Sequence, residues 1–167
     1  MTPKKNPNYE RALKRPFPLS SISFRRGPGG SKELAYITAR DAMQRLDDVF
    51  GVGGWQTRYE YIGERIVCYL SCNFAGEWIT KADGADDTQI EGAKGGLSDA
   101  LKRAAVQFGI ARYLYHPGAF NGRTPAKWAT PEGYDEIMAE REGAEIEDFR
   151  KALKKAAKAE DIVVKAS

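Results

Sequence analysis

The stretch TRYEYIGERIVCYLSCNFAGEWITKADG, residues 57–84, holds three runs in which apolar and polar side chains alternate, and short glycine-containing connections separate the runs. Alternation with a period of two, in runs rich in β-branched and aromatic residues, predicts β-strands. The connections near Gly63 and Gly76 are short enough to favour antiparallel pairing. We therefore expect a three-stranded antiparallel β-meander whose apolar face is formed by Ile66, Cys68, Leu70, Cys72 and Phe74.

Such a sheet needs a helix over its apolar face, and KGGLSDALKRAAVQFGIARYLY, residues 94–115, is the candidate. On a helical wheel at about 100° per residue, one sector holds the residues that we expect to pack on the sheet. They are Leu97, Leu101, Ala104, Phe108, Ala111 and Tyr115. Lys102 and Arg103 lie outside that sector, on the side of Val106, so we expect this basic pair to point toward solvent or a ligand.

A second helix is predicted before the sheet, within AYITARDAMQRLDDVFG, residues 35–51, where apolar residues recur at three- and four-residue spacing. Thr38 can serve as its N-cap, with Asp41 three residues later, and Gly51 can end it. Together these elements predict an α+β fold, in which a three-stranded meander is packed by a long helix (a β-β-β-α core) and an N-terminal helix precedes it.

Composition divides the chain into three parts. Residues 1–31 hold five prolines, and the breaker-rich RRGPGGSK stretch at residues 25–32 overlaps their end, which predicts a basic N-terminal arm and loop. The core is assigned to residues 32–116, and residues 117–167 are interpreted as a linker and a charged C-terminal tail. Within the tail, residues 132–148 carry eight acidic residues and one arginine, whereas residues 150–158 carry five basic residues and no acid. Such a tail can stay solvated, fold as a charged helix, or contact the basic arm of a neighbour.

The compartment follows from the apolar runs and the cysteines. Cys68 and Cys72 are too far apart along one strand for an unstrained disulfide, so we expect buried thiols, which suit a reducing cytoplasm. The apolar runs are too short to cross a bilayer, and the N-terminus lacks the apolar segment of a secretory signal. We therefore expect a cytoplasmic protein without a membrane partner.

Catalytic and metal-binding interpretations find little support. His116 is the only histidine, and it lies in a turn-like HPG sequence, so a Ser-His-Asp or Cys-His system has few residues to use. Asp83, Asp86 and Asp87 match no calcium loop and favour a turn before a helix. The chain has no GxxxxGK[ST] sequence for nucleotide phosphates. We expect a binding protein that is not an enzyme and needs no cofactor.

The order of these elements, rather than any single motif, resembles a known family. A basic loop, the Y-I-x-x-R-x-x-x-x-x-L-x-x-x-F-G pattern with a following GW, the meander, and the S-D-x-L-K-R-A…F-G pattern occur in that order over about residues 20–115. The chain thus resembles the Rad fifty-two family of single-strand annealing proteins, and among them the short phage and prophage members often called Sak.

The resemblance implies a function for the basic pair. Family members assemble side by side into rings, and single-stranded DNA runs along a groove around the ring with its bases held outward for pairing. In that arrangement Lys102 and Arg103 would contact phosphates, Arg26 aligns with another groove arginine, and Arg65 matches a second DNA-binding surface. Arg25 and Lys32 are nearby basic residues without a firm counterpart.

The resemblance therefore predicts ATP-independent binding and annealing of single-stranded DNA in homologous recombination and DNA repair. The expected partners are single-stranded DNA, further copies of the chain in a ring or helical homo-oligomer, and a single-strand-binding protein or an exonuclease. Physical reasoning supports the DNA assignment, because cations fixed on a packed helix hold phosphates without reading base edges.

One departure from the family pattern leaves alternatives open. Val106 stands where the family often has a third basic residue, so the groove would be less positive or would recruit Arg112 or Lys94. An oligomeric scaffold of the same fold without annealing activity is one alternative. A divalent-dependent catalytic role around Asp83, Asp86 and Asp87 is the other.

Overall fold

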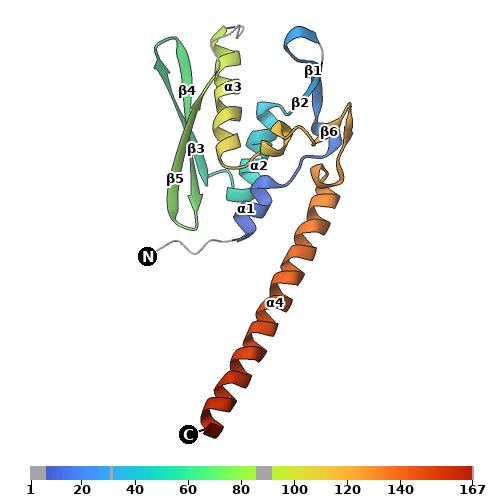
Figure 1. Cartoon of the computed structure of the whole chain (residues 1–167). Helices are drawn as coiled ribbons and strands as arrows, with labels where there is room; N and C mark the ends of the chain where they lie inside the picture. Colours follow the sequence, from blue (N-terminus) through green and yellow to red (C-terminus); the bar gives the residue numbers. More distant parts are fainter. Residues whose placement is uncertain (1–6, 31, 86–91, 167) are drawn as a thin grey trace.

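A computed structural model describes residues 7–30, 32–85 and 92–166 (Figure 1). Its centre is a three-stranded antiparallel sheet in the order β3-β4-β5. The strands are β3 (Trp55–Ile62), β4 (Arg65–Phe74) and β5 (Glu77–Gly84). This is the predicted meander, and both predicted turns are present: Gly63 and Gly76 have φ angles of 62° and 96°, which glycine adopts readily.

The inward face of β4 forms the floor of the core. Ile66, Cys68, Leu70 and Cys72 are buried, and Phe74 packs against them partly buried, as the alternation predicts. Both cysteines are free thiols. Burial raises the pKa of Cys68 to about 11 and that of Cys72 to about 12, so neither thiol ionises near neutral pH.

Helix α2 (Ala39–Phe50) begins and ends as the sequence predicts. The Asp41 backbone N–H donates to Thr38 Oγ1 at 3.2 Å, and the Thr38 N–H donates to Asp41 Oδ2 at 2.8 Å, which completes a capping box. Asp47 near its C-terminus accepts a 2.7 Å hydrogen bond from the indole N–H of Trp55 at the start of β3. The helix is thereby joined to the sheet.

Helix α3 (Gly92–Gln107) covers β4 and β5 (Figure 1). Within the predicted face, Leu101, Ala104, Phe108 and Ala111 are buried. The prediction was wrong for Leu97 and Tyr115, which are 39% and 59% exposed.

The helix ends earlier than predicted because the chain reverses after Gln107. Gly109 has a φ of 105° and Ala111 a φ of 58°, so a wheel of constant pitch no longer applies there. A 3₁₀ turn, η3 (Arg112–Tyr115), follows. Arg112 donates from Nε to the carbonyl of Val106 at 3.0 Å and from Nη2 to that of Gln107 at 2.7 Å, which caps the exposed end of the helix.

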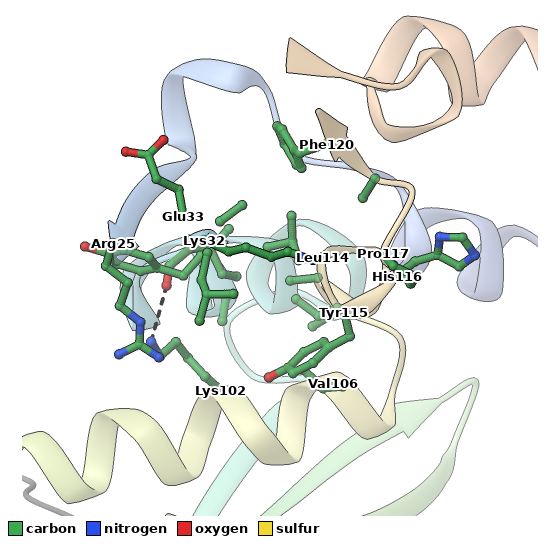
Figure 2. A pocket seen from close by; sticks show the side chains of 18 of the residues that line it. Arg25, Lys32, Glu33, Lys102, Val106, Leu114, Tyr115, His116, Pro117 and Phe120 are labelled. Atoms are coloured by element: carbon green, nitrogen blue, oxygen red, sulfur yellow. Dashed lines mark hydrogen bonds between the residues drawn. The ribbon is translucent and has the colours of Figure 1, made fainter. Parts of the chain in front are cut away.

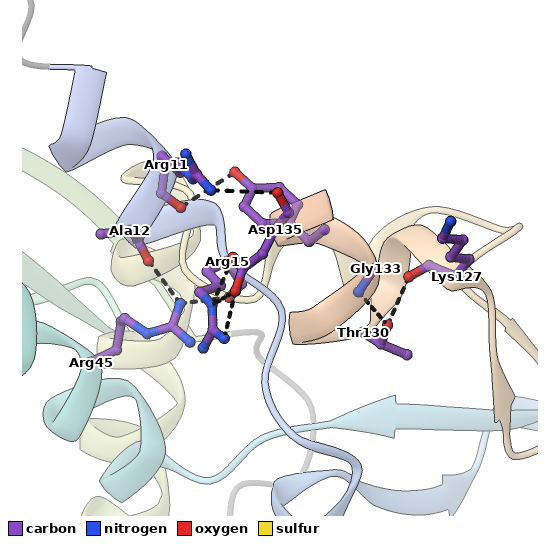
Figure 3. A network of polar contacts seen from close by, with 9 residues as sticks. Arg11, Ala12, Arg15, Arg45, Lys127, Thr130, Gly133 and Asp135 are labelled. Carbon is purple, nitrogen blue, oxygen red and sulfur yellow. Dashed lines mark hydrogen bonds and ion pairs between the residues drawn. The ribbon is translucent and has the colours of Figure 1, made fainter. Parts of the chain in front are cut away.

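The N-terminal segment is structured, although its prolines predicted an arm. It contains α1 (Pro7–Lys14), η1 (Leu19–Ser21) and a hairpin of β1 (Ser23–Arg26) and β2 (Glu33–Tyr36), joined by η2 (Pro28–Gly30). The arm prediction missed Leu13 and Phe17, whose side chains are buried in the core. Arg45 of α2 fixes the end of α1 by donating to three carbonyls, those of Ala12, Leu13 and Arg15 (Figure 3).

The C-terminal part has two contrasting pieces. Within the segment that was interpreted as a linker, residues 119–129 form a packed hairpin of β6 (Phe120–Asn121) and β7 (Thr124–Pro125) followed by η4 (Lys127–Ala129), with Ala119 and Ala129 buried. The tail folds as one charged helix, α4 (Pro131–Ala166), which leaves the body of the molecule (Figure 1). Among the helices in the described ranges, none has the length and apolar content that crossing a membrane requires.

Ion pairs join the N-terminal part of α4 to α1 and to Arg15, which directly follows α1. Arg15 donates to Asp135 in a bidentate contact with a shortest distance of 2.9 Å, and Arg11 pairs with Glu142 at 3.0 Å. Figure 3 shows Asp135 facing the guanidinium groups of Arg11 and Arg15. The acidic tail therefore contacts the basic N-terminal segment of its own chain.

Candidate nucleic-acid interface

An open cleft of about 680 Å³ lies between the β1-β2 hairpin, the C-terminal half of α3 and residues 114–122 (Figure 2). Its floor is apolar and includes Ile37, Ile110 and Leu114. Four of the six predicted DNA-binding residues are among its lining residues, namely Arg25, Lys32, Lys102 and Arg103. The fold thus gathers cations from the hairpin and from α3, which are about seventy residues apart in sequence.

Lys102 is held at the wall of the cleft. Its ammonium donates to the carbonyl of Ile37 at 3.4 Å and lies 5.6 Å from the centre of the Tyr36 ring. Arg25 lies at the same distance from that ring, so Tyr36 contacts two cations from different elements. Burial lowers the pKa of Lys102, and the positive charges of Arg103 and Arg25 lower it too, whereas Asp99 raises it.

Burial is the main cause of the lowered pKa of Lys102, and the nearby positive charges of Arg103 and Arg25 act in the same direction, so the charged form of Lys102 is disfavoured in the free protein. Within the described residues, neither Lys102 nor Arg25 forms an ion pair. Glu33, the acidic residue among those that line the cleft, pairs with Arg123 at 2.7 Å, and this contact lowers the Glu33 pKa. An anion in the cleft would therefore meet cations whose charges are not already neutralised.

Arg103 is fixed more firmly than Lys102. Its Nη2 pairs with Asp99 at 3.2 Å, one turn earlier on α3, and its guanidinium lies 5.7 Å from the Tyr115 ring centre. Its Nε is buried and, among the residues that the structure describes, has no hydrogen-bond partner. Arg103 also lines a smaller hollow with Asp83 and Arg112, so it separates two depressions on the surface.

The β1-β2 hairpin distinguishes Arg25 from Arg26. Successive strand residues point to opposite faces, and Arg25 lines the cleft while Arg26 is exposed and is not one of its lining residues. The resemblance had selected Arg26 and had left Arg25 without a counterpart. In this structure Arg25 is the hairpin arginine that joins Lys102, whereas Arg26 lies opposite Glu33 in the hairpin register.

The third basic position behaves differently from the other two. Val106 is half-buried and lines both depressions, so the wall one turn beyond the pair is apolar. Arg112, a suggested replacement, uses its guanidinium to cap α3. The side chain of Lys94, the other suggested replacement, lies outside the described residues.

Arg65 occupies a separate location. It begins β4 directly after the β3-β4 turn, and it is exposed and absent from the cleft lining. Figure 1 shows that turn at the same end of the molecule as the tip of the β1-β2 hairpin, with α3 between them. Arg65 and the cleft are therefore two surfaces of one protomer.

Asp83 and His116, which were considered as candidate catalytic residues, form local structural contacts. Asp83 accepts hydrogen bonds from the Gly84 N–H at 2.8 Å and from Gln107 at 3.4 Å, while Asp86 and Asp87 lie outside the described residues. His116 Nδ1 accepts from the Gly118 N–H at 3.0 Å, and its ring packs edge-on against Trp128. Within residues 7–30, 32–85 and 92–166, no group of three or more histidine, cysteine or acidic residues could hold a metal ion.

Sequence reasoning missed the aromatic members of the site. Tyr36 and Tyr115 each lie against a cation, but the sequence placed Tyr36 in a motif and Tyr115 on a packed face. A signal was present for Tyr36, because it lies eleven residues after Arg25 on the far side of a breaker-rich turn, where a hairpin brings the two strands together.

Comparisons with known proteins agree with the resemblance. A family model described as the Rad52/22 family double-strand break repair protein matches residues 7–67 and 69–125, which include the cleft and exclude α4. The single-stranded DNA-binding protein DdrA of Deinococcus radiodurans is 30% identical over 129 residues, covering 73% of this chain and 58% of the relative. The DdrA of Deinococcus deserti is 32% identical over 115 residues, covering 65% of this chain and 57% of the relative. The chain thus spans somewhat more than half the length of these curated relatives, and the narrower phage subtype stays a prediction.

Proposed function

The chain belongs to the Rad52/22 family of double-strand break repair proteins, and from this premise we propose that it binds single-stranded DNA and anneals complementary strands without ATP. One observation carries the proposal: Arg25, Lys102 and Arg103 gather around an open cleft in which the charged form of Lys102 is disfavoured. The DdrA relatives, whose names describe single-stranded DNA binding, support the choice of ligand. Annealing would serve recombination and repair in the compartment that holds the DNA.

The proposed mechanism begins with phosphate binding. Lys102 and Arg103 stand on a helix packed against a sheet, so their positions are fixed before the strand arrives. A phosphate placed between Lys102 and Arg25 would raise the lysine pKa toward its ordinary value, because it supplies the missing negative charge. Contacts of this kind hold the backbone without reading the sequence, and the base edges stay free to find a complement.

Assembly of several copies is the second part of the proposal. One protomer offers only a few cations in the cleft, which hold a strand weakly. A ring or helical homo-oligomer would repeat the cleft along the strand, and many weak contacts then give strong binding. Arg65, on its separate surface, is proposed to engage the second strand or a duplex, and Arg26 and Lys32 are proposed to extend the track at the hairpin tip. A single-strand-binding protein or an exonuclease would supply or exchange the strand.

Annealing of two complementary fluorescent oligonucleotides without nucleotide tests the proposal. The decisive variant carries Lys102→Ala and Arg103→Ala. The control variant carries Lys127→Ala and Arg141→Ala, which removes two exposed positive charges near the base of α4. We expect annealing by the wild type and by the control, and we expect the cleft variant to lose it. The salt dependence of binding should flatten by about 1.4 in the slope of log K against log salt, because two phosphate contacts are lost.

The same experiment distinguishes DNA annealing from the scaffold alternative, which the apolar wall at Val106 favours. A scaffold of the same fold would assemble yet show no acceleration of annealing in the wild type. Annealing that the wild type and the cleft variant perform equally would instead place the DNA elsewhere, and the Arg65 surface would be the next to test. Circular dichroism of each variant excludes loss of fold as the cause.

A further inference from the structure

The outer part of α4 carries an apolar stripe without a partner in its own protomer. Every residue from 139 to 158 is exposed, including the large apolar residues Ile146, Phe149 and Leu153, which are 52%, 64% and 54% exposed. Their spacing of three and four residues puts them on one helix face, in the manner of the seam of a coiled coil. Exposed apolar side chains aligned in this way over two turns indicate a docking surface rather than scattered surface residues.

This stripe continues a face that is already used for packing. On a wheel of about 100° per residue, Asp135 and Glu142 fall in the same 60° sector as the three apolar residues, to about that precision. Asp135 pairs with Arg15, which directly follows α1, and Glu142 pairs with Arg11 of α1. Helix α4 leaves the body of the molecule (Figure 1), and after Glu142 the residues of this face change from charged to apolar. The inner half of this face is covered by α1, and the described part of the chain provides no cover for the outer half.

The charges beside the stripe identify what could cover it. Residues 139–148 carry five acidic residues and one arginine, whereas residues 149–158 carry five basic residues and no acid. A parallel copy of the helix would place acid against acid and base against base. An antiparallel copy, crossing near residue 150, would place each acidic half against a basic half while the two apolar stripes meet.

We propose that the outer half of α4 pairs with the same segment of a second copy of the chain as a short antiparallel two-helix coiled coil. The pair has twofold symmetry, because the same face serves both copies. Its seam contains Ile146, Phe149 and Leu153 from each helix, and its flanks contain the complementary charges. The segment lies outside the region that the family model matches, so this association is separate from the core and from the DNA site.

Sedimentation velocity tests whether the stripe joins two copies. The variant Phe149→Ser with Leu153→Ser removes the seam, and Val52→Ser is the control because Val52 is an exposed apolar residue elsewhere, 82% exposed. An antiparallel pair that crosses near residue 150 puts the two bodies at its opposite ends, so it joins two separate core assemblies and not two neighbours within one ring. We therefore expect the wild type and the control to sediment with twice the mass of the seam variant at the same protein concentration. Equal masses for wild type and seam variant would overturn the proposal, and a circular dichroism spectrum with unchanged helix content establishes that α4 still folds.

Cross-linking tests the direction of the pair. With a crossing near residue 150, Cys introduced as Ala152→Cys would lie close to its counterpart, whereas Ala139→Cys would lie about 30 Å from its own. A short bis-maleimide reagent should therefore couple two copies of the Ala152 variant and not of the Ala139 variant. Cys68 and Cys72 are buried, and the wild type measures any cross-linking that these two native cysteines give. Coupling of both variants would mean parallel helices and would overturn the antiparallel pair.

Two variants with reversed charges test whether the flanking charges hold the pair together. If they do, mixing the two variants restores the association, which a merely structural role of α4 would not show. One variant carries Glu145→Lys, Glu147→Lys and Asp148→Lys, which leaves residues 143–158 with basic residues and no acid. The other carries Arg150→Glu, Lys151→Glu and Lys154→Glu, which makes it mostly acidic. We expect each variant alone to sediment with half the wild-type mass and their equimolar mixture to recover the full mass. Full mass for either variant alone would contradict the proposed role of the charges.

Discussion

Helices α3 and α4 each carry two adjacent basic residues, and the two pairs have opposite surroundings. Lys102 and Arg103 are half-buried beside Tyr36, Asp99 and Tyr115, whereas Lys154 and Lys155 are exposed on a helix that leaves the body. Burial lowers the pKa of Lys102. The comparison shows that a basic pair becomes a candidate binding site when the fold fixes both side chains and leaves one of them, here Lys102, without an ion-pair partner among the described residues. The sequence of the pair alone does not reveal this difference.

The aromatic residues of the same helical regions give the largest expected difference. Phe108, at the end of α3, is 8% exposed and stacks on Phe74, whereas Phe149 on α4 is 64% exposed. Replacing Phe108 with Ala should lower the free energy of unfolding by about 3 to 5 kcal/mol, because it leaves a cavity in the core. Replacing Phe149 with Ala should change that free energy by less than about 0.5 kcal/mol in the dissociated protein.

Urea unfolding followed by circular dichroism, at one low protein concentration, measures both variants. A Phe108→Ala protein as stable as the wild type would show that α3 is not packed on the sheet as described. A large loss of stability in the Phe149→Ala protein would mean that α4 is covered within its own protomer, which would also remove the reason for a second copy on that face.

The next prediction separates binding from stability at Lys102. Replacing Lys102 with Met removes a phosphate contact, so single-stranded DNA binding should weaken about tenfold, the effect of about 1.4 kcal/mol. Because the folded-state pKa of Lys102 is lowered, its charged form opposes folding below that pKa, and the opposition fades as the pH rises through it. Lys102→Met should therefore unfold at the same urea concentration as the wild type, or at a higher one, near neutral pH.

Lys154→Met is the matched control for this prediction, because Lys154 is an exposed lysine on α4 and does not line the cleft. Its DNA binding should fall by less than about twofold, and the small loss should disappear as salt is added. A Lys102→Met protein that is clearly less stable than the wild type would show that the lysine is needed for packing, and the basic pair would lose its best argument for a ligand.

How much the sequence could predict depends on how local the signal was. The capping box of α2 and the three strands were predicted correctly because their signals depend only on residues close together in the sequence. These signals are the spacing of Thr38 and Asp41 and the alternation along β4. The end of α3 was missed because a wheel ignores the reversal at Gly109. Helix α1 was missed because the prolines near it outweighed the signal of its one buried apolar residue, Leu13.

The sequence could predict some of the residues that line the cleft, but it could not predict how they are arranged in space. The basic pair of α3 could be selected because it interrupts an apolar helix, and the structure places it at a cleft. Which hairpin arginine joins it depends on strand register, since a shift of one residue exchanges Arg25 and Arg26 between faces. The approach of Tyr36 to Lys102 joins elements more than sixty residues apart, and no local pattern specifies such a contact.

The smallest expected effect concerns the boundary between the covered and uncovered halves of α4. The Arg15 guanidinium, which donates to Asp135, holds the pKa of that carboxyl below its ordinary value. Its folded-state pKa is lowered, so the stabilisation is fully present above the ordinary aspartate pKa of about 4 and is lost as the pH falls through the folded-state value. Because both partners are 41% exposed, Asp135→Asn should lower the free energy of unfolding by less than about 1 kcal/mol at pH 7 and by nothing in strong acid. Urea titrations at pH 7 and pH 3 measure the difference. A loss that persists unchanged at both pH values would assign Asp135 a packing role, and the inner half of α4 would then be held by contacts other than charge.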